Sequence, residues 1–396
     1  MTARRFVLTT TTFALMTTAV PAAQPDPYLD VIRNLRHPNP ETRLEALAQL
    51  NRAAYADAAE AVAPLVTDPD DRVQAAAIDA ELSFFLIDRV SGGKSRAQNA
   101  FNAGPLLRGS AAAPPLLVDR LTAAMRDDNA RIAFDAVHAL GFLAERPLAP
   151  TQIAALVGEL DHYDPIMRAA TARVLARLHA PEAADKLVQG TVDSNAVVQR
   201  FAVESLGWIG EPRAIPQLRQ LAAQAKPPLR AGAYLALARL ASAEDVVQFR
   251  QLVSDRDPSL RRAGVEGIGR AGDRESIEVV RRLMTADRSP EVRLASAFAL
   301  HKLGETQSHV IASRLGVRAE AIQAQEYLFE LGREAVPGVA ATLEVTINPP
   351  HRAALVQTIG YLGDGPDEVF VEPALKDADQ RVVRAATHAV TRLRRR

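Results

Sequence analysis

The histidines are the first residues in this chain that could suggest metal chemistry. There are eight, at positions His37, His138, His162, His179, His301, His309, His351 and His388. None of their spacings matches the short helical intervals at which metal-binding helices place their ligands. The chain has no cysteine, which excludes thiolate metal sites, thiol catalysis and disulfides. We therefore predict no metal site and no cofactor, with the histidines facing solvent or at helix ends.

Serine chemistry and nucleotide binding also lack their motifs. No Gly-x-Ser-x-Gly sequence is present, so nothing marks an activated serine. Gly93-Lys94-Ser95 is similar to the end of a phosphate-binding loop, but Asp88 stands where that loop requires glycine. We predict no catalytic residue, although a triad assembled only by folding stays open.

A row of arginines is the strongest indication of a binding surface. Arg219, Arg250 and Arg281 follow one another at intervals of 31 residues, and the row is extended by Arg282 and Arg314. Because arginine binds carboxylates and phosphates through paired N–H groups, we expect an acidic peptide or protein as ligand. The alternative is a solvated helix face, and Glu278 is placed for local pairing with Arg281.

The same interval belongs to an internal repeat. One apolar position, which we call the anchor, recurs as Leu50, Leu82, Leu140, Leu175, Leu206, Leu237, Ile268, Leu300, Leu328, Ile359 and Val390. Proline often lies ten residues before the anchor, and glycine often lies four residues after it. Proline near a helix start and glycine just past its end are typical helix signals. Each period therefore predicts a helix, a tight turn and a second helix, and the chain is predicted to be all-α.

One interval is irregular. Leu82 and Leu140 are 58 residues apart, and the excess lies at about 85–115, a segment rich in glycine and proline. We predict a long loop that could contain one short helix. Its weak apolar periodicity predicts a segment more mobile than the repeats.

The N-terminus has the pattern of a secretory signal peptide. Arg4 and Arg5 precede an apolar stretch that ends at Val20-Pro21-Ala22, a small-residue cleavage site. We predict a signal peptide over 1–23, a repeat domain over 24–396, and export to the periplasm. The general secretory and twin-arginine routes both remain open, because the arginine pair fits the second only loosely. No later segment is apolar enough to span a membrane.

Composition narrows the class of protein. With 47 Lys+Arg against 47 Asp+Glu, the zero net charge argues against nucleic acid as a partner. A single hydrophobic core stops growing at about 250–300 residues, so 396 residues require several domains or a repeat without a central core.

Three segments resemble HEAT repeats of the phycobilisome-lyase HEAT-like type: Asp257-Pro258-Ser259-Leu260-Arg261, Ser289-Pro290-Glu291-Val292-Arg293 and Leu206-Gly207-Trp208-Ile209-Gly210. The resemblance covers roughly residues 28–396. It implies a right-handed α-solenoid, an armadillo/HEAT-like superhelix of about ten to eleven helix-turn-helix repeats of about 31 residues. It also implies that the second helices line the concave groove, so that the arginine row faces that groove.

Two classes of function follow. The first is an exported, non-enzymatic scaffold that binds a protein or peptide in its concave groove. The alternative is an enzyme on the same fold, either a metal-dependent oxidoreductase like deoxyhypusine hydroxylase or a lyase-like protein. That hydroxylase uses His-Glu pairs, and no histidine here is followed by glutamate. We therefore favour the scaffold, while the partner and the oligomeric state stay open.

Overall fold

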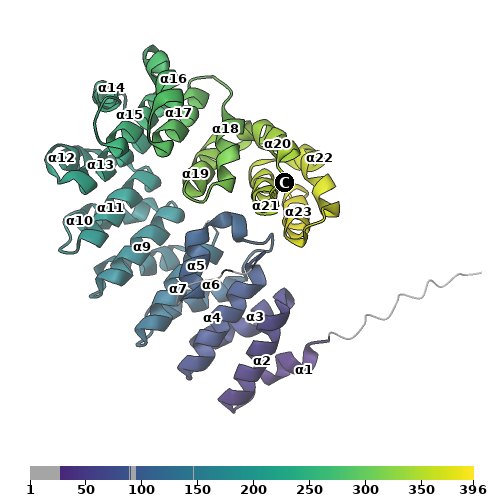
Figure 1. Cartoon of the computed structure of the whole chain (residues 1–396). Helices are drawn as coiled ribbons and strands as arrows, with labels where there is room; N and C mark the ends of the chain where they lie inside the picture. The colour runs from purple at the N-terminus through teal and green to yellow at the C-terminus, as the bar shows by residue number, and fades with distance from the viewer. Residues whose placement is uncertain (1–26, 89, 91–94, 146) are drawn as a thin grey trace, which may run out of the picture.

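The computed structural model describes residues 27–396 apart from 89, 91–94 and 146, so the predicted signal peptide lies outside the described residues. The described part is an α-solenoid that curves into an incomplete ring (Figure 1). We call the helix that carries an anchor the first helix of its repeat. These are α2 (Pro40–Ala53), α4 (Asp71–Phe85), α7 (Ala130–Leu143), α9 (Pro165–Arg177), α11 (Ala196–Ile209), α13 (Pro227–Leu240), α15 (Pro258–Ala271), α17 (Pro290–Lys302), α19 (Ala321–Leu331), α21 (Pro349–Leu362) and α23 (Gln380–Leu393).

Shorter second helices alternate with them. These are α3 (Ala59–Val62), α6 (Pro115–Ala124), α8 (Pro150–Gly158), α10 (Ala184–Gly190), α12 (Ile215–Gln224), α14 (Val246–Leu252), α16 (Ile277–Ala286), α18 (Ser308–Ser313), α20 (Val336–Val345) and α22 (Glu368–Val371). Two helices stand outside the alternation: α1 (Leu29–Asn34) at the start and α5 (Arg96–Ala103) between α4 and α6. All eleven anchors are buried, with at most 6% of each residue exposed. The apolar spacing therefore identified the core correctly.

Short polar side chains start the first helices and link neighbouring repeats. Asp257 accepts a hydrogen bond from the Ser259 amide at 2.8 Å, as an N-cap residue does. Asp287 accepts from the Ser289 amide at 2.8 Å and also binds the Arg261 guanidinium of the preceding repeat at 2.8 Å. The same link recurs as Arg43–Asp68, Arg168–Asp193 and Arg352–Asp377. These recurring charges are structural.

Close contacts between first helices accompany the curvature. A β-carbon built on Gly207 would lie 2.7 Å from Ala236, and one on Gly269 or Gly360 would lie 2.6 Å from Ala299 or Ala389. Glycine and alanine thus let consecutive first helices approach until their backbones nearly touch. Between second helices of the described part, a glycine makes such a contact only where Gly338 on α20 meets α18. A stack of helix pairs whose helices lie closer together on one side curves toward that side. The first helices accordingly form the concave face (Figure 1).

The insertion at about 85–115 is packed against the ring. It contains α5 and a short 3-10 turn at Pro105–Leu107. Ala97, Ala100 and Phe101 are at most 2% exposed. The expectation of a segment with little apolar face to bury is therefore wrong for the described part, because α5 presents alanines and a phenylalanine on one side. Among the described residues, no helix is both long and apolar enough to cross a membrane.

Candidate binding face

The predicted arginine row lies on the outer helices and not in the groove. Arg219, Arg250 and Arg281 belong to α12, α14 and α16, which lie on the convex side of the ring (Figure 1). The predicted placement is wrong because the first helices, not the second, make the repeated close contacts and face inward. Whether these arginines bind a partner from the outside stays a prediction.

Each arginine of this row braces the next repeat. Arg219 binds Asp245 at 2.9 Å, Arg250 binds Asp273 at 2.6 Å, and Arg281 binds Glu305. The hydrogen bond from Arg250 lowers the pKa of Asp273. The two extending residues differ. Arg314 lies 3.9 Å from Glu320, whereas Arg282 is exposed on α16 and has no ion pair within the described part of the chain.

Helix α5 and the first helix α19 contact other first helices on the concave face. Side chains of α9 reach α5, since Arg173 donates to Asn102 at 2.7 Å and Arg177 to the Phe101 carbonyl at 2.6 Å. Side chains of α13 and α15 reach α19 in the same way, through Arg239–Glu326 at 3.2 Å and Arg270–Glu330 at 2.8 Å. The groove expected to be open is thus partly filled by its own chain.

A buried ionic network fixes α19 in place. Glu266 on α15 is fully buried and accepts hydrogen bonds from Arg262 at 2.7 Å, Arg270 at 2.6 Å and the Tyr327 hydroxyl at 2.5 Å. Burial alone would raise the pKa of Glu266, but the neighbouring guanidiniums lower it further than burial raises it. The carboxylate therefore stays charged and holds α19 against the concave face.

The C-terminal helix closes the ring onto the insertion. Arg384 on α23 donates to the Ile87 carbonyl at 3.1 Å, and Arg392 donates to the Gly109 carbonyl at 2.8 Å. Tyr361 on α21 donates to the Pro105 carbonyl at 2.8 Å. Segments more than 250 residues apart in the sequence are thus joined mainly through backbone carbonyls of the insertion.

Between α5 and α19 lies a group of three arginines and two phenylalanines, which we call the inner arginine cluster: Arg173, Arg177, Arg200, Phe101 and Phe201. The Arg177 guanidinium carbon lies 3.9 Å from the Phe101 ring centre, and that of Arg173 lies 5.0 Å from both ring centres. Arg200 lies 4.4 Å from the Phe201 ring centre. Stacking on aromatic rings holds the guanidiniums in fixed positions.

This cluster carries more positive charge than its surroundings neutralise. Within the described residues, no carboxylate lies within 4.0 Å of Arg173, Arg177 or Arg200, and Glu204 and Glu326 act on Arg173 and Arg177 only at longer range. Burial, together with the like charge of Arg173, lowers the pKa of Arg177 to about 10. Arg177 is still charged at neutral pH, so the cluster can accept an anion.

Two buried ionisable groups, on α7 and α4, lack full hydrogen bonding within the described part of the chain. His138 on α7 is 1% exposed, and burial lowers its pKa to about 4. Its Nε2 has no partner in the described part of the chain, and its ring lies 5.4 Å from that of Phe101. The prediction of solvent-facing or helix-end histidines is wrong for this residue, which is a core residue. Glu81 on α4 is fully buried, and burial raises its pKa well above the usual range.

Sequence reasoning missed the inner cluster although a signal was available. The position two residues after the anchor is Arg177, Trp208, Arg239 and Arg270 in four consecutive repeats. Arg239 stacks on Trp208 at 3.4 Å, so this register faces inward. The row that begins at Arg219 lies on the opposite side of the repeat. Among the described residues there is no group of three or more His, Asp or Glu side chains that could hold a metal ion.

Comparisons with known proteins agree with this architecture. Residues 153–238 and 246–324 match the family model of HEAT repeats. The search of curated proteins gives no match. Similar solved structures include an engineered protein (18% identity over 92% of this chain and 98% of that one, TM-score 0.42). They also include human deoxyhypusine hydroxylase in complex with glycerol (20% identity over 70% and 96%, TM-score 0.31).

A further similar structure is the complex of CpcE and CpcF of phycocyanin lyase from Nostoc (17% identity over 81% of this chain and 100% of that one, TM-score 0.32). At these identities and TM-scores, no property of the three proteins is carried over to this chain. The helix pairs and the buried anchors agree with the matched segments, and the chain is an α-solenoid that contains HEAT repeats over residues 153–238 and 246–324.

Proposed function

We propose that this chain is a non-enzymatic scaffold that binds a protein partner on its concave face. The binding surface is the part of α9 and α11 that lies between α5 and α19 and is not covered by them. The observation that carries the proposal is the inner arginine cluster, whose charge has no carboxylate within 4.0 Å in the described part of the chain. HEAT repeats commonly serve as binding surfaces for proteins. An ordered, under-neutralised cationic surface suits a partner with acidic side chains.

Site-specific photocrosslinking tests this proposal. A photoreactive amino acid at Glu204, which is exposed on α11, should capture a defined partner in cells. The same amino acid at Val247, which is 66% exposed on the outer helix α14, is the matched control and should not capture it. Equal capture from both positions, or capture from Val247 alone, would place the partner on the outside.

We also propose export, which rests on the N-terminal pattern of Arg4, Arg5 and the Val20-Pro21-Ala22 site. N-terminal sequencing of the native protein should then begin close to residue 24. Native protein that retains Met1 and fractionates with the cytosol would contradict export. The enzyme alternative is tested by metal analysis of the purified protein, in which stoichiometric iron would overturn the scaffold proposal.

A further inference from the structure

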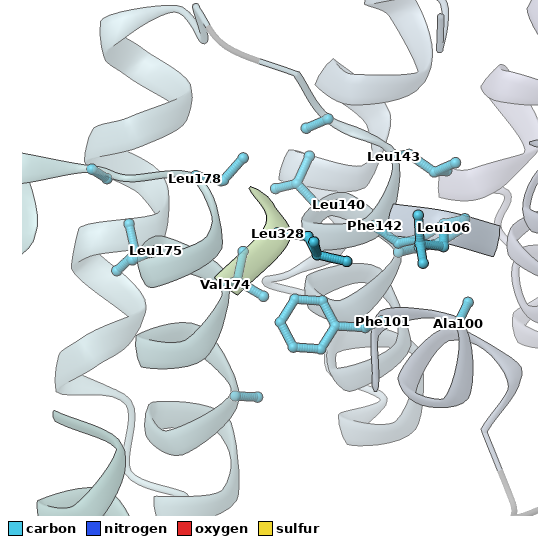
Figure 2. Packing of buried hydrophobic residues seen from close by; sticks show 14 of the residues in the cluster. Ala100, Phe101, Leu106, Leu140, Phe142, Leu143, Val174, Leu175, Leu178 and Leu328 are labelled. Carbon is cyan, nitrogen blue, oxygen red and sulfur yellow. The ribbon is translucent and has the colours of Figure 1, made fainter. Parts of the chain in front are cut away.

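The end of α5, which supplies Phe101 to the inner arginine cluster, contacts Arg173 and Arg177 of α9 in the manner of a bound ligand. The Phe101 ring enters a notch between α7 and α9, where it lies beside Val174 and Leu328 (Figure 2). A β-carbon built on Gly141 would lie 2.8 Å from this ring and 2.6 Å from Val174. Only glycine at position 141 leaves room for the ring, so the notch is fitted to an aromatic side chain.

The two acceptors that the end of α5 offers to the arginines of α9 are uncharged. Arg177 donates to the Phe101 carbonyl at 2.6 Å, and Arg173 donates to the Asn102 side-chain oxygen at 2.7 Å. The C-terminal end of a helix contributes only a partial negative charge. Two charged donors therefore face two uncharged acceptors, and a carboxylate in the place of the Asn102 amide would bind more strongly.

The internal ligand is also tethered to the chain, so an external ligand must bind more strongly than an untethered copy of it in order to displace it. The start of α5 is attached to the ring through Ser95, which hydrogen-bonds to Asp135 at 2.5 Å. Flexible tethers give a linked ligand an effective concentration of about millimolar. An external segment that only copies Phe101-Asn102 would therefore be outcompeted, whereas one with a carboxylate gains the charge-assisted contact.

We infer that the notch together with Arg173 and Arg177 forms a recognition site for a partner segment in which an aromatic residue is followed directly by aspartate or glutamate. This segment displaces the end of α5 from Gly141, Arg173 and Arg177. The inference rests on the proposed function and specifies the kind of partner segment that the concave face binds.

Peptide binding to the full chain tests the inference. The probes are a labelled peptide with the sequence of residues 96–103 and the same peptide carrying Asn102→Asp, and the chain carries Phe101→Ala to weaken its internal ligand. The aspartate peptide should bind about tenfold more tightly than the unchanged peptide. Arg173→Gln in the chain should remove that difference. Equal affinities, or no binding of either peptide, would overturn the inference.

A second measurement leaves the core unaltered, since Phe101→Ala could impair folding. Asn102→Asp in the otherwise unchanged chain should slow amide hydrogen exchange of residues 97–103 by about tenfold, and Arg173→Gln should cancel the effect. Ala103→Asp adds the same charge one residue later, at an exposed position, and should give no protection. Equal protection by the two aspartates, or none by Asn102→Asp, would overturn the inference.

These outcomes separate the inference from the proposed function. If Glu204 crosslinks a partner but the aspartate peptide gains nothing, only the recognition chemistry is wrong. If the peptide binds as expected but no partner is captured from Glu204, the proposed function is wrong.

Discussion

The outer and inner faces of this ring both carry arginines, yet the outer row and the arginines of α9 have different partners. On the outer helices, Arg219, Arg250 and Arg281 bind carboxylates of the next repeat and remain 38–46% exposed. On the inner face, Arg173 and Arg177 contact aromatic rings and neutral oxygens of α5. Residue type and period are therefore insufficient to assign a role. The role depends on which groups the curvature places opposite each arginine.

The largest effect is expected from breaking the inner ionic network. Glu266→Ala leaves Arg262 and Arg270 buried without their shared carboxylate, and we expect a loss of about 3–5 kcal/mol in the free energy of unfolding. Chemical denaturation measures this. Glu278→Ala removes an outer carboxylate with a 74% exposed side chain and should be nearly neutral. Similar losses for the two variants would mean that the inner network contributes no more to the free energy of unfolding than an exposed carboxylate does.

The second-largest loss of stability is expected from a substitution that pushes two neighbouring first helices apart. Gly269→Ala forces a β-carbon to within 2.6 Å of Ala299, so backbone must shift, and we expect a loss of about 1–3 kcal/mol. A β-carbon on Gly158 would meet no atom within 4 Å, and Gly158→Ala should raise stability by about 0.4–1 kcal/mol. Thermal unfolding of both variants checks the opposite signs. A neutral Gly269→Ala would show that the inner row is not held at contact distance.

The two buried glutamates should make the free energy of unfolding depend on pH in opposite directions. The folded-state pKa of Glu266 is lowered, so its contribution is present above the ordinary carboxyl pKa and is lost as pH falls toward the folded value. The folded-state pKa of Glu81 is raised, so stability falls as pH rises from the ordinary value toward the folded one. Glu81→Gln should therefore stabilise the chain by about 1 kcal/mol at neutral pH and lose this gain below pH of about 4. A gain that does not vary with pH would contradict the assignment.

The smallest effect is expected on the outer face. Replacing Arg219, Arg250 and Arg281 together by alanine removes three links between neighbouring repeats and should lower the unfolding temperature, more at low salt than at high salt. Arg282→Ala is the matched control on the same helix as Arg281 and should leave the unfolding temperature unchanged. If the triple variant unfolds like the control, these ion pairs do not brace the repeats.

The repeat and its core could be predicted from the sequence because both depend on local spacing. Every first helix has a buried anchor, and many also have a proline at the start or a glycine at the end, such as Gly210, whose φ of +74° fits a helix end. Local spacing could not predict which helices form the concave face, because the curvature depends on Gly–Ala contacts between residues about 30 positions apart. The position of α5 was equally inaccessible, since one buried phenylalanine in an eight-residue helix does not specify where it docks.

Closure of the ring by α23 on the insertion has a consequence for how such a chain can evolve. An open solenoid can gain or lose a repeat by duplication or deletion, because each unit touches only its neighbours. Here Arg392 reaches the Gly109 carbonyl across 283 residues, and one repeat added between these two residues would break that contact. The contact therefore constrains the number of repeats between the insertion and α23, whereas the helices α1 to α4 precede the insertion and are free of this constraint.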